Sequence, residues 1–354
     1  MHFADGQIPV AYRRYLGRKR LAIAMGLVAL AGLLVAAVGS GAVDLAAGDV
    51  VRSLLRRETP AQVEAIVWNI RLPQALTAIV AGAGLALSGA VMQAVLRNPL
   101  GSPFTLGVAQ AAAFGAALAV MVLGGGAATS SGPAGTVMPG ALTASAFTWS
   151  AISSLVIVLL ARVRGTTPEV MVLAGVALGA LFTAGTMFLQ YFADDTQLAA
   201  MVFWTFGDTA RASWGEVGLL AGATAAVWIV FQAGSWDYNA IDAGDETARS
   251  LGVAVGRVRW LGMLLAALLT AVIIAHLGVI GFVGLVAPHM ARRIVGADHR
   301  FLLPATLVLG AILLLAADTV ARLLLAPRVL PVSVLTAFLG APAFLALILR
   351  RRRP

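Results

Sequence analysis

The sequence lacks cysteine altogether, and histidine occurs only four times in its 354 residues. Without cysteine there can be no disulfide, no thiolate metal site and no sulfur nucleophile. The histidines do not have the spacing of a metal-binding motif, and the phosphate-cradling loop GxxxxGK[ST] is absent. We therefore expect no catalytic residue, no metal site and no nucleotide site in this chain.

Charge is the second shortage. Charged residues make up 12% of the chain, hydrophobic residues make up 60%, and the mean hydropathy is +0.91. A soluble domain is about a quarter charged, so these few charges could not cover a surface that faces water. Lipid must therefore be the solvent, and we expect an all-α integral membrane protein.

Long apolar runs predict a polytopic bundle of about ten transmembrane helices, because a span needs about 20 apolar residues. The expected spans are 20–40, 63–94, 104–123, 138–161, 170–192, 214–233, 257–276, 281–293, 300–323 and 332–349. The segment Gly278–Gly284 is too glycine-rich to face lipid. Irregular backbone at membrane depth persists only where protein or a water-filled cavity surrounds it, so we expect this segment inside the bundle. Residues 1–354 are predicted to form a single transmembrane domain.

The formal net charge of +9 is explained by membrane orientation and not by nucleic acid. Arginines gather at alternate junctions between the expected spans, including residues 350–353 at the end of the chain. Cytoplasmic loops carry such an excess of basic residues. We therefore place residues 1–20 and the carboxyl terminus in the cytoplasm.

A polar segment at 239–255 separates two of the expected spans. Asp245 and Glu246 begin a short helical pattern there, and Gly252 ends it. Such a cytoplasmic helix is either a docking element for a partner or an inert connector. Elsewhere, Asp318 and Arg322 lie four residues apart on one helix and can pair, as a structural ion pair or as a functional one.

Several long motifs resemble one known family, the permeases of type II ABC importers, which take up iron-siderophores, haem and cobalamin. They are RLPQALTAIVAGAGLALSGAVMQAVLRNPLGSPFTLGV at 71–108, VLAGVALGA at 172–180, AGDETARSLGV at 243–253 and GVIGFVGLVAPHMARRIVGADHRFLLP at 278–304. The resemblance covers nearly the whole chain from Arg71 onward. It implies the type II importer permease fold in the inner (plasma) membrane.

The resemblance also implies partners and cofactors. Two copies of the permease would form a homodimer in lipid, and two ATPase subunits would bind ATP and magnesium, so that this chain binds neither. A periplasmic or lipoprotein substrate-binding protein would dock on the outer face. The residues that match the ATPase-coupling segment are Asp242, Gly244, Asp245, Glu246, Ala248, Arg249, Leu251 and Gly252.

Gate and docking residues are also implied by the resemblance. The inner gate matches Asn98, Pro99 and Leu100, with a second part at Thr167 and Pro168. A proline cannot continue the helical hydrogen-bond ladder, so a break at Pro99 is expected on physical grounds as well. The residues that match the binding-protein contacts are Arg71, Gln74 and Arg322, and Gln74 stands where the family often has a second arginine.

The function we expect is therefore the permease of an ATP-driven importer for an iron chelate, either a ferric siderophore or haem. The alternative substrate is cobalamin. A secondary transporter driven by an ion gradient would need buried acidic or histidine relays, and these are almost absent. A membrane-embedded enzyme would need a catalytic constellation, which the sequence does not contain.

Overall fold

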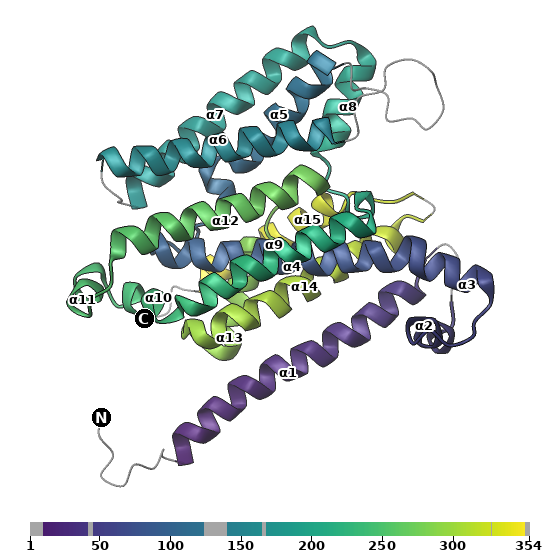
Figure 1. Ribbon diagram of the computed structural model, residues 1–354, viewed down its shortest axis with the longest axis horizontal. Coiled ribbons are helices and arrows are strands. Elements are labelled where there is room, and N and C mark those ends of the chain that lie inside the picture. The colour runs from purple at the N-terminus through teal and green to yellow at the C-terminus, as the bar shows by residue number, and fades with distance from the viewer. Residues whose placement is uncertain (1–9, 42–44, 124–139, 165–167, 327, 351–354) are drawn as a thin grey trace.

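The computed structural model describes residues 10–41, 45–123, 140–164, 168–326 and 328–350. Every regular element in these ranges is a helix, so the expected all-α fold is confirmed. Residues 124–139 lie outside the described ranges, as does Thr167 of the predicted gate. Figure 1 shows the helices as one elongated bundle with their axes roughly aligned.

All ten expected spans fold as helices. They are α1 (Val10–Gly39), α4 (Leu72–Val95), α5 (Val108–Leu123), α6 (Ala141–Arg164), α7 (Pro168–Phe192), α9 (Trp214–Ala233), α12 (Val255–Leu277), α13 (Val283–Val295), α14 (His299–Leu324) and α15 (Val332–Arg350). Within the described residues, seven helices are long and apolar enough to cross a membrane, and Val108–Val122 and Val332–Pro342 form shorter apolar helices. The span that contains α4 begins with α3 (Ala61–Ile66) and a π-helical turn at Val67–Arg71.

Four further short helices lie outside the expected spans. They are α2 (Ala47–Leu54), α8 (Asp195–Thr205), α10 (Ser235–Asp242) and α11 (Asp245–Ser250). The sequence predicted only α11. Asp194 caps α8, because its carboxylate accepts a 2.8 Å hydrogen bond from the backbone N–H of Gln197.

Helix α4 lies at the centre of the bundle, where α9, α12, α13 and α14 pack around it. Glycines bring the backbones together at two crossings. A Cβ atom at Gly82 would collide with the backbone of Gly310 in α14, and a Cβ at Gly89 would collide with that of Gly284 in α13. Small residues at such crossings are the usual way for helices to associate in lipid. Figure 1 shows α5, α6, α7 and α8 as a lobe on the far side of α12.

The glycine-rich segment before α13 is irregular and buried, as predicted. Residues 278–282 adopt no helix, and Gly278 has a φ of +80°. Ile280 is fully buried, and the carbonyl of Leu277 accepts a hydrogen bond from the backbone N–H of Asp208 at 2.8 Å. This hydrogen bond joins the irregular segment to the chain that follows α8.

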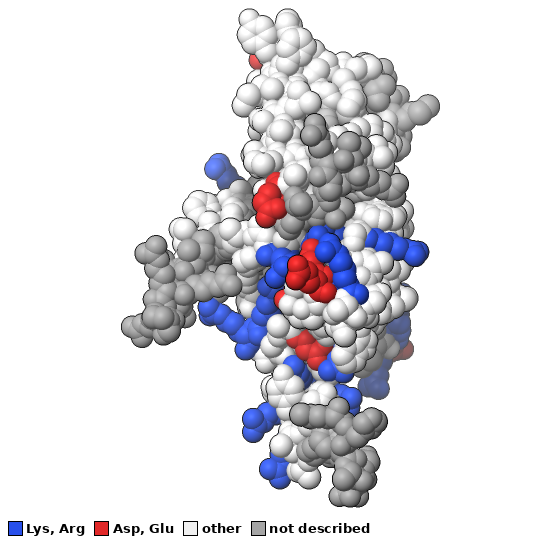
Figure 2. Space-filling model, turned by 90° about the vertical axis from the view of Figure 1, so that its left-hand side faces the viewer, with Lys and Arg blue, Asp and Glu red and all other residues white. Residues whose placement is uncertain are grey.

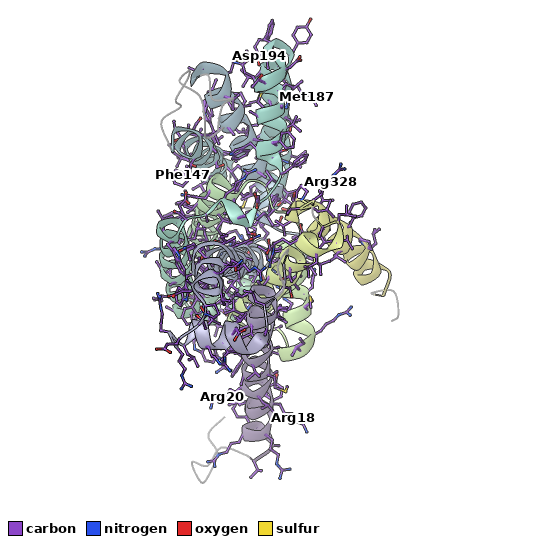
Figure 3. All side chains as sticks on the ribbon, turned by 90° about the vertical axis from the view of Figure 1, so that its right-hand side faces the viewer. Arg18, Arg20, Phe147, Met187, Asp194 and Arg328 are labelled. Carbon is purple, nitrogen blue, oxygen red and sulfur yellow. The ribbon has the colours of Figure 1, made fainter. Side chains whose placement is uncertain are left out.

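The two ends of the bundle carry different elements. We call the end with α10 and α11 the α11 face, and the end with α2 and α3 the α2 face (Figure 1). Figure 2 views the α11 face and shows basic and acidic side chains gathered at its centre. Figure 3 views the α2 face, where Asp194 lies at the tip of the α5–α8 lobe, while Arg18 and Arg20 extend from α1 away from the other helices.

Candidate coupling site and gate

The predicted gate residues follow the last turn of α4. The backbone N–H groups of Arg97 and Asn98 donate to the carbonyls of Ala94 and Gln93, at 3.0 and 3.1 Å. These two bonds define a Schellman cap, whose reversal point is usually glycine because it requires positive φ. Here Arg97 occupies that point with a φ of +47°, a conformation that costs roughly 1–2 kcal/mol outside glycine.

The chain then makes a tight turn, and we call Leu96–Gly101 the gate turn. The side-chain oxygen of Asn98 accepts a hydrogen bond from the backbone N–H of Leu100 at 2.9 Å, and its backbone oxygen accepts one from Gly101, also at 2.9 Å. Pro99 has no N–H to extend the helix. The predicted break after α4 is therefore confirmed, whereas the gating function of these residues stays a prediction.

The predicted coupling helix is present as α11, between two glycines with positive φ. Gly244 has a φ of +122° and Gly252 has a φ of +86°, values that L-residues with side chains rarely adopt. Ala248 is buried, in one apolar cluster with Ile241 and Val255. The buried residue of α11 is therefore a small one, Ala248.

The other side of α11 faces outward. Glu246, Arg249 and Leu251 are exposed, and Leu251 retains 69% of its accessible surface. An exposed leucine beside charged residues at the end of a membrane bundle is a suitable contact for a protein partner. Docking of an ATPase on this surface stays a prediction.

A buried arginine joins α11 to α4. Arg259 of α12 retains 3% of its surface. Its two terminal nitrogens bind the carboxylate of Asp245 in the first turn of α11, with distances of 3.0 to 3.2 Å. Its Nε donates to the carbonyl oxygen of Val95, the last residue of α4, at 2.7 Å. Arg97 lies 3.9 Å from the same carboxylate. We call Arg97, Asp245 and Arg259 the inner cluster.

The inner cluster opens into a pocket of about 780 Å³. Its lining comes from the gate turn, from the inner cluster and from the first turns of α7: Leu96, Arg97, Asn98, Pro99, Glu169, Val172, Leu173, Asp245 and Arg259. Pro168, the second predicted gate position in the described residues, is the first residue of α7. The structure thus brings Asn98 and Pro99 of the predicted gate, Asp245 of the predicted coupling helix and the first turns of α7 to one pocket.

Helix α10 is tied to the start of α14 by a second polar group. Asn239 accepts a 2.8 Å hydrogen bond from the backbone N–H of His299 and donates one to Asp298 at 3.0 Å. Asp242 lies 3.7 Å from the ring of His299. Burial raises the pKa of Asp242 against the opposing effect of Arg292 and Arg97. For Asp298, burial raises the pKa, but hydrogen bonds from Arg300 and Asn239 outweigh it and hold the pKa at about 2.

The predicted docking arginines lie at the opposite end, on the α2 face, and both bind the carbonyl end of α1. Arg71 retains 6% of its surface and donates to Val38 and Gly39 at 2.8 Å each. Arg322 donates to Ala37 at 3.2 Å and to Ser40 at 3.3 Å. Two arginines therefore cap four consecutive carbonyls that no helical N–H can reach.

A buried carboxylate organises the same region. Asp318 pairs with Arg322 at 3.1 Å, which confirms that the two residues can pair across one helical turn. Asp318 also accepts hydrogen bonds from Gln74 at 3.1 Å and from Thr209. Gln74 thus has a structural partner of its own. The structural interpretation of the ion pair is supported, and the docking assignment of Arg71, Gln74 and Arg322 stays a prediction.

With this geometry known, similarity to other proteins decides the family. The model of the FecCD transport family matches residues 27–350. The chain belongs to the FecCD transport family. This FecCD chain is a transport subunit, and the hydrolysis of ATP belongs to a separate subunit.

The similar proteins are named as transport permeases, and a solved transporter has the same fold. The FecCD chain is 49% identical over 346 residues to a protein of Methanocaldococcus jannaschii named as an ABC transporter permease, covering 97% of this chain and 98% of that one. It is 37% identical to the hemin transport system permease protein of Yersinia pestis, covering 94% and 96%. A solved inward-facing metal-chelate type ABC transporter has a TM-score of 0.81 at 31% identity, covering 93% and 98%. Other relatives are named for Fe(3+)-citrate, vitamin B12 and molybdate import.

Sequence reasoning missed Arg259 in this FecCD chain, because it was taken for an orientation charge. One signal was available. Arg259 follows Val255 by four residues, and positions with that spacing share one face of a helix. Both side chains are buried. An arginine on an inward-facing helical position needs a partner, and this requirement could have singled it out.

Proposed function

We propose that this FecCD chain moves an iron chelate, a ferric siderophore or haem, from a binding protein into the cytoplasm. The observation that carries the proposal is the pocket at the α11 face, where the gate turn, α7 and the exposed helix α11 meet. A partner that moves α11 would act on the gate turn through a buried ion pair. This arrangement suits a pathway that is opened by an external motor.

The proposed assembly contains two copies of this chain and two ATPase subunits, which bind ATP and magnesium. The ATPases dock on α11 through Glu246, Arg249 and Leu251, which are exposed. A periplasmic or lipoprotein binding protein docks on the α2 face near Arg71 and Arg322. The α11 face, and with it both termini, then faces the cytoplasm from the plasma membrane.

One observation favours a chelate over a bare ion as the substrate. Within the described residues, no group of three or more histidine, aspartate or glutamate side chains is placed to hold a metal ion. Cobalamin is the second candidate, because several relatives are named for vitamin B12 import.

The test is ligand-stimulated ATP hydrolysis in lipid vesicles. The chain is reconstituted with its ATPase and its binding protein, which is loaded in turn with ferric siderophore, haem, cobalamin or molybdate. We expect stimulation by a ferric siderophore or by haem, with uptake of the same ligand. Stimulation by cobalamin or molybdate alone would refute the iron-chelate assignment and leave the importer mechanism standing. Failure of the ATPase to bind the chain would refute the mechanism itself.

A further inference from the structure

Helices α11 and α4 both contact the guanidinium group of one residue, Arg259. Helix α11 is largely exposed, and its buried residue is Ala248, which packs in one apolar cluster with Ile241 and Val255. Helix α4 is buried along most of its length and ends at the gate turn. Arg259 contacts Asp245 in α11 and the carbonyl of Val95 in α4. Arg259 is therefore a buried polar side chain that bonds to both α11 and α4.

The geometry of this contact is directional. The planar guanidinium holds the carboxylate of Asp245 with both terminal nitrogens, and such bidentate pairs fix orientation as well as distance. Its Nε donates to the carbonyl oxygen of Val95 at 2.7 Å. Because Arg259 is almost fully buried, neither contact can be exchanged for water without cost. A displacement of Asp245 is therefore passed to the last turn of α4.

The gate turn follows Val95 without a flexible link. The hydrogen bond from Asn98 N–H to the carbonyl of Gln93 closes the cap over the last turn of α4, and the Asn98 side chain fixes Leu100. The pocket of about 780 Å³ separates this turn from α7, so there is room for it to move. The turn therefore moves as one body with the end of α4.

We propose that Arg259 is a positioning residue that transmits the movement of α11 to the gate turn. The proposal rests on the proposed docking of an ATPase on α11. Under this proposal, the link between α11 and the gate turn comes from the side chain of Arg259 and not from the packing of α11 against the bundle. Removing the guanidinium would leave only the longer and more exposed contact of 3.9 Å between Asp245 and Arg97 of the gate turn, so the gate turn should follow the movement of α11 less closely.

The test follows the gate turn directly. The chain has no cysteine, so Leu100→Cys introduces a single thiol on an exposed position of the turn. The complete complex of two chains and two ATPases is prepared in lipid nanodiscs. The rate at which a water-soluble maleimide labels this thiol is then measured with and without ATP, together with ATP hydrolysis. The comparison is made in the Leu100→Cys background alone and combined with Arg259→Gln, Arg259→Lys or Asp245→Asn.

With Arg259 in place, we expect ATP to change the labelling rate. In Arg259→Gln we expect the ATP-dependent change to fall about tenfold, a typical size for coupling between sites, while the ATPase stays bound and hydrolyses ATP. Arg259→Lys retains the charge but cannot bridge both partners, so its change should be intermediate. Asp245→Asn removes the carboxylate charge that both Arg259 and Arg97 face, so its loss should be at least as large even if Arg259→Gln folds poorly.

Arg257→Gln is the matched control, because Arg257 lies exposed in the same helical turn. It should leave the ATP-dependent change intact. An unchanged response in Arg259→Gln would overturn the proposal while the importer mechanism stands, even where Asp245→Asn loses the change, because Arg97 would then carry the coupling. Loss of ATP hydrolysis in parallel with the labelling change would also overturn it, because Arg259 would then only support the fold. Absence of ATPase binding to the unsubstituted chain would instead overturn the proposed function.

Discussion

The double arginine cap on α1 leads to a prediction about stability. In Arg71→Met the apolar stem is retained while the donors to Val38 and Gly39 are removed. A buried carbonyl left without a donor costs about 1–3 kcal/mol. The carbonyl of Gly39 keeps a hydrogen bond from the backbone N–H of Leu45 at 3.1 Å. Loss of the donor to the buried carbonyl of Val38 therefore predicts a destabilisation of about 1–3 kcal/mol. Arg52→Met is the matched control, because Arg52 is 64% exposed and its pair with Asp49 spans 3.4 Å. An exposed pair contributes less than about 1 kcal/mol.

The assay is thermal unfolding of the purified chain in lipid nanodiscs. We expect the midpoint of Arg71→Met to fall by roughly 2 °C or more, and that of Arg52→Met to stay close to that of the unsubstituted chain. Equal midpoints for the two variants would refute the cap as a stabilising element. The result also bears on docking, since any loss of binding-protein capture in an Arg71 variant must be measured on chain that is shown to be folded.

Three further predictions follow from other parts of the structure. Gly89→Ala should destabilise the chain by about 1–3 kcal/mol, because a Cβ there meets the backbone of Gly284. Gly222→Ala should not destabilise it, because a Cβ at Gly222 meets open space. Thermal unfolding of the two variants distinguishes them. Leu251→Ser should weaken ATPase binding about tenfold in a titration, because it removes the largest exposed apolar group of the coupling segment. Asp298→Asn should reduce the loss of stability on acidification. The pKa of Asp298 is held at about 2, below its ordinary value of about 3.9. The contribution of Asp298 to stability is therefore complete above about pH 4 and is lost as the pH falls through 2. Unfolding midpoints of variant and unsubstituted chain across this range check the difference.

Much of the fold could be predicted from the sequence, because long apolar runs permit few alternatives in lipid. Helix α11 was also predictable, since Gly244 and Gly252 stop a short pattern from extending. The pairing of Asp318 with Arg322 followed from helix geometry and is present at 3.1 Å. All of these features depend on residues that are close together in the chain.

The features that escaped prediction depend on contacts between distant residues. Arg259 and Val95 lie 164 positions apart, and nothing in either local segment indicates the other. Burial of Arg71 was missed for the same reason, since its partners belong to the end of α1, more than thirty residues earlier. Helix α8 was missed because it is short, at 11 residues. Composition predicts where helices form, but the partners of a buried charge depend on packing.

Arg71 and Arg259 have much in common, and yet different consequences are expected from their loss. Both are nearly buried and both donate to carbonyls at the end of a helix. The acceptors of Arg71 described above belong to the backbone of α1, which Arg322 also holds, so removal of Arg71 weakens an anchorage and should appear as lost stability. Arg259 also binds a carboxylate on α11, a largely exposed helix whose buried residue is Ala248. Under the proposal above, loss of Arg259 should therefore appear as lost coupling. The distinguishing feature is the exposure of the element that each arginine binds, and not the burial of the arginine.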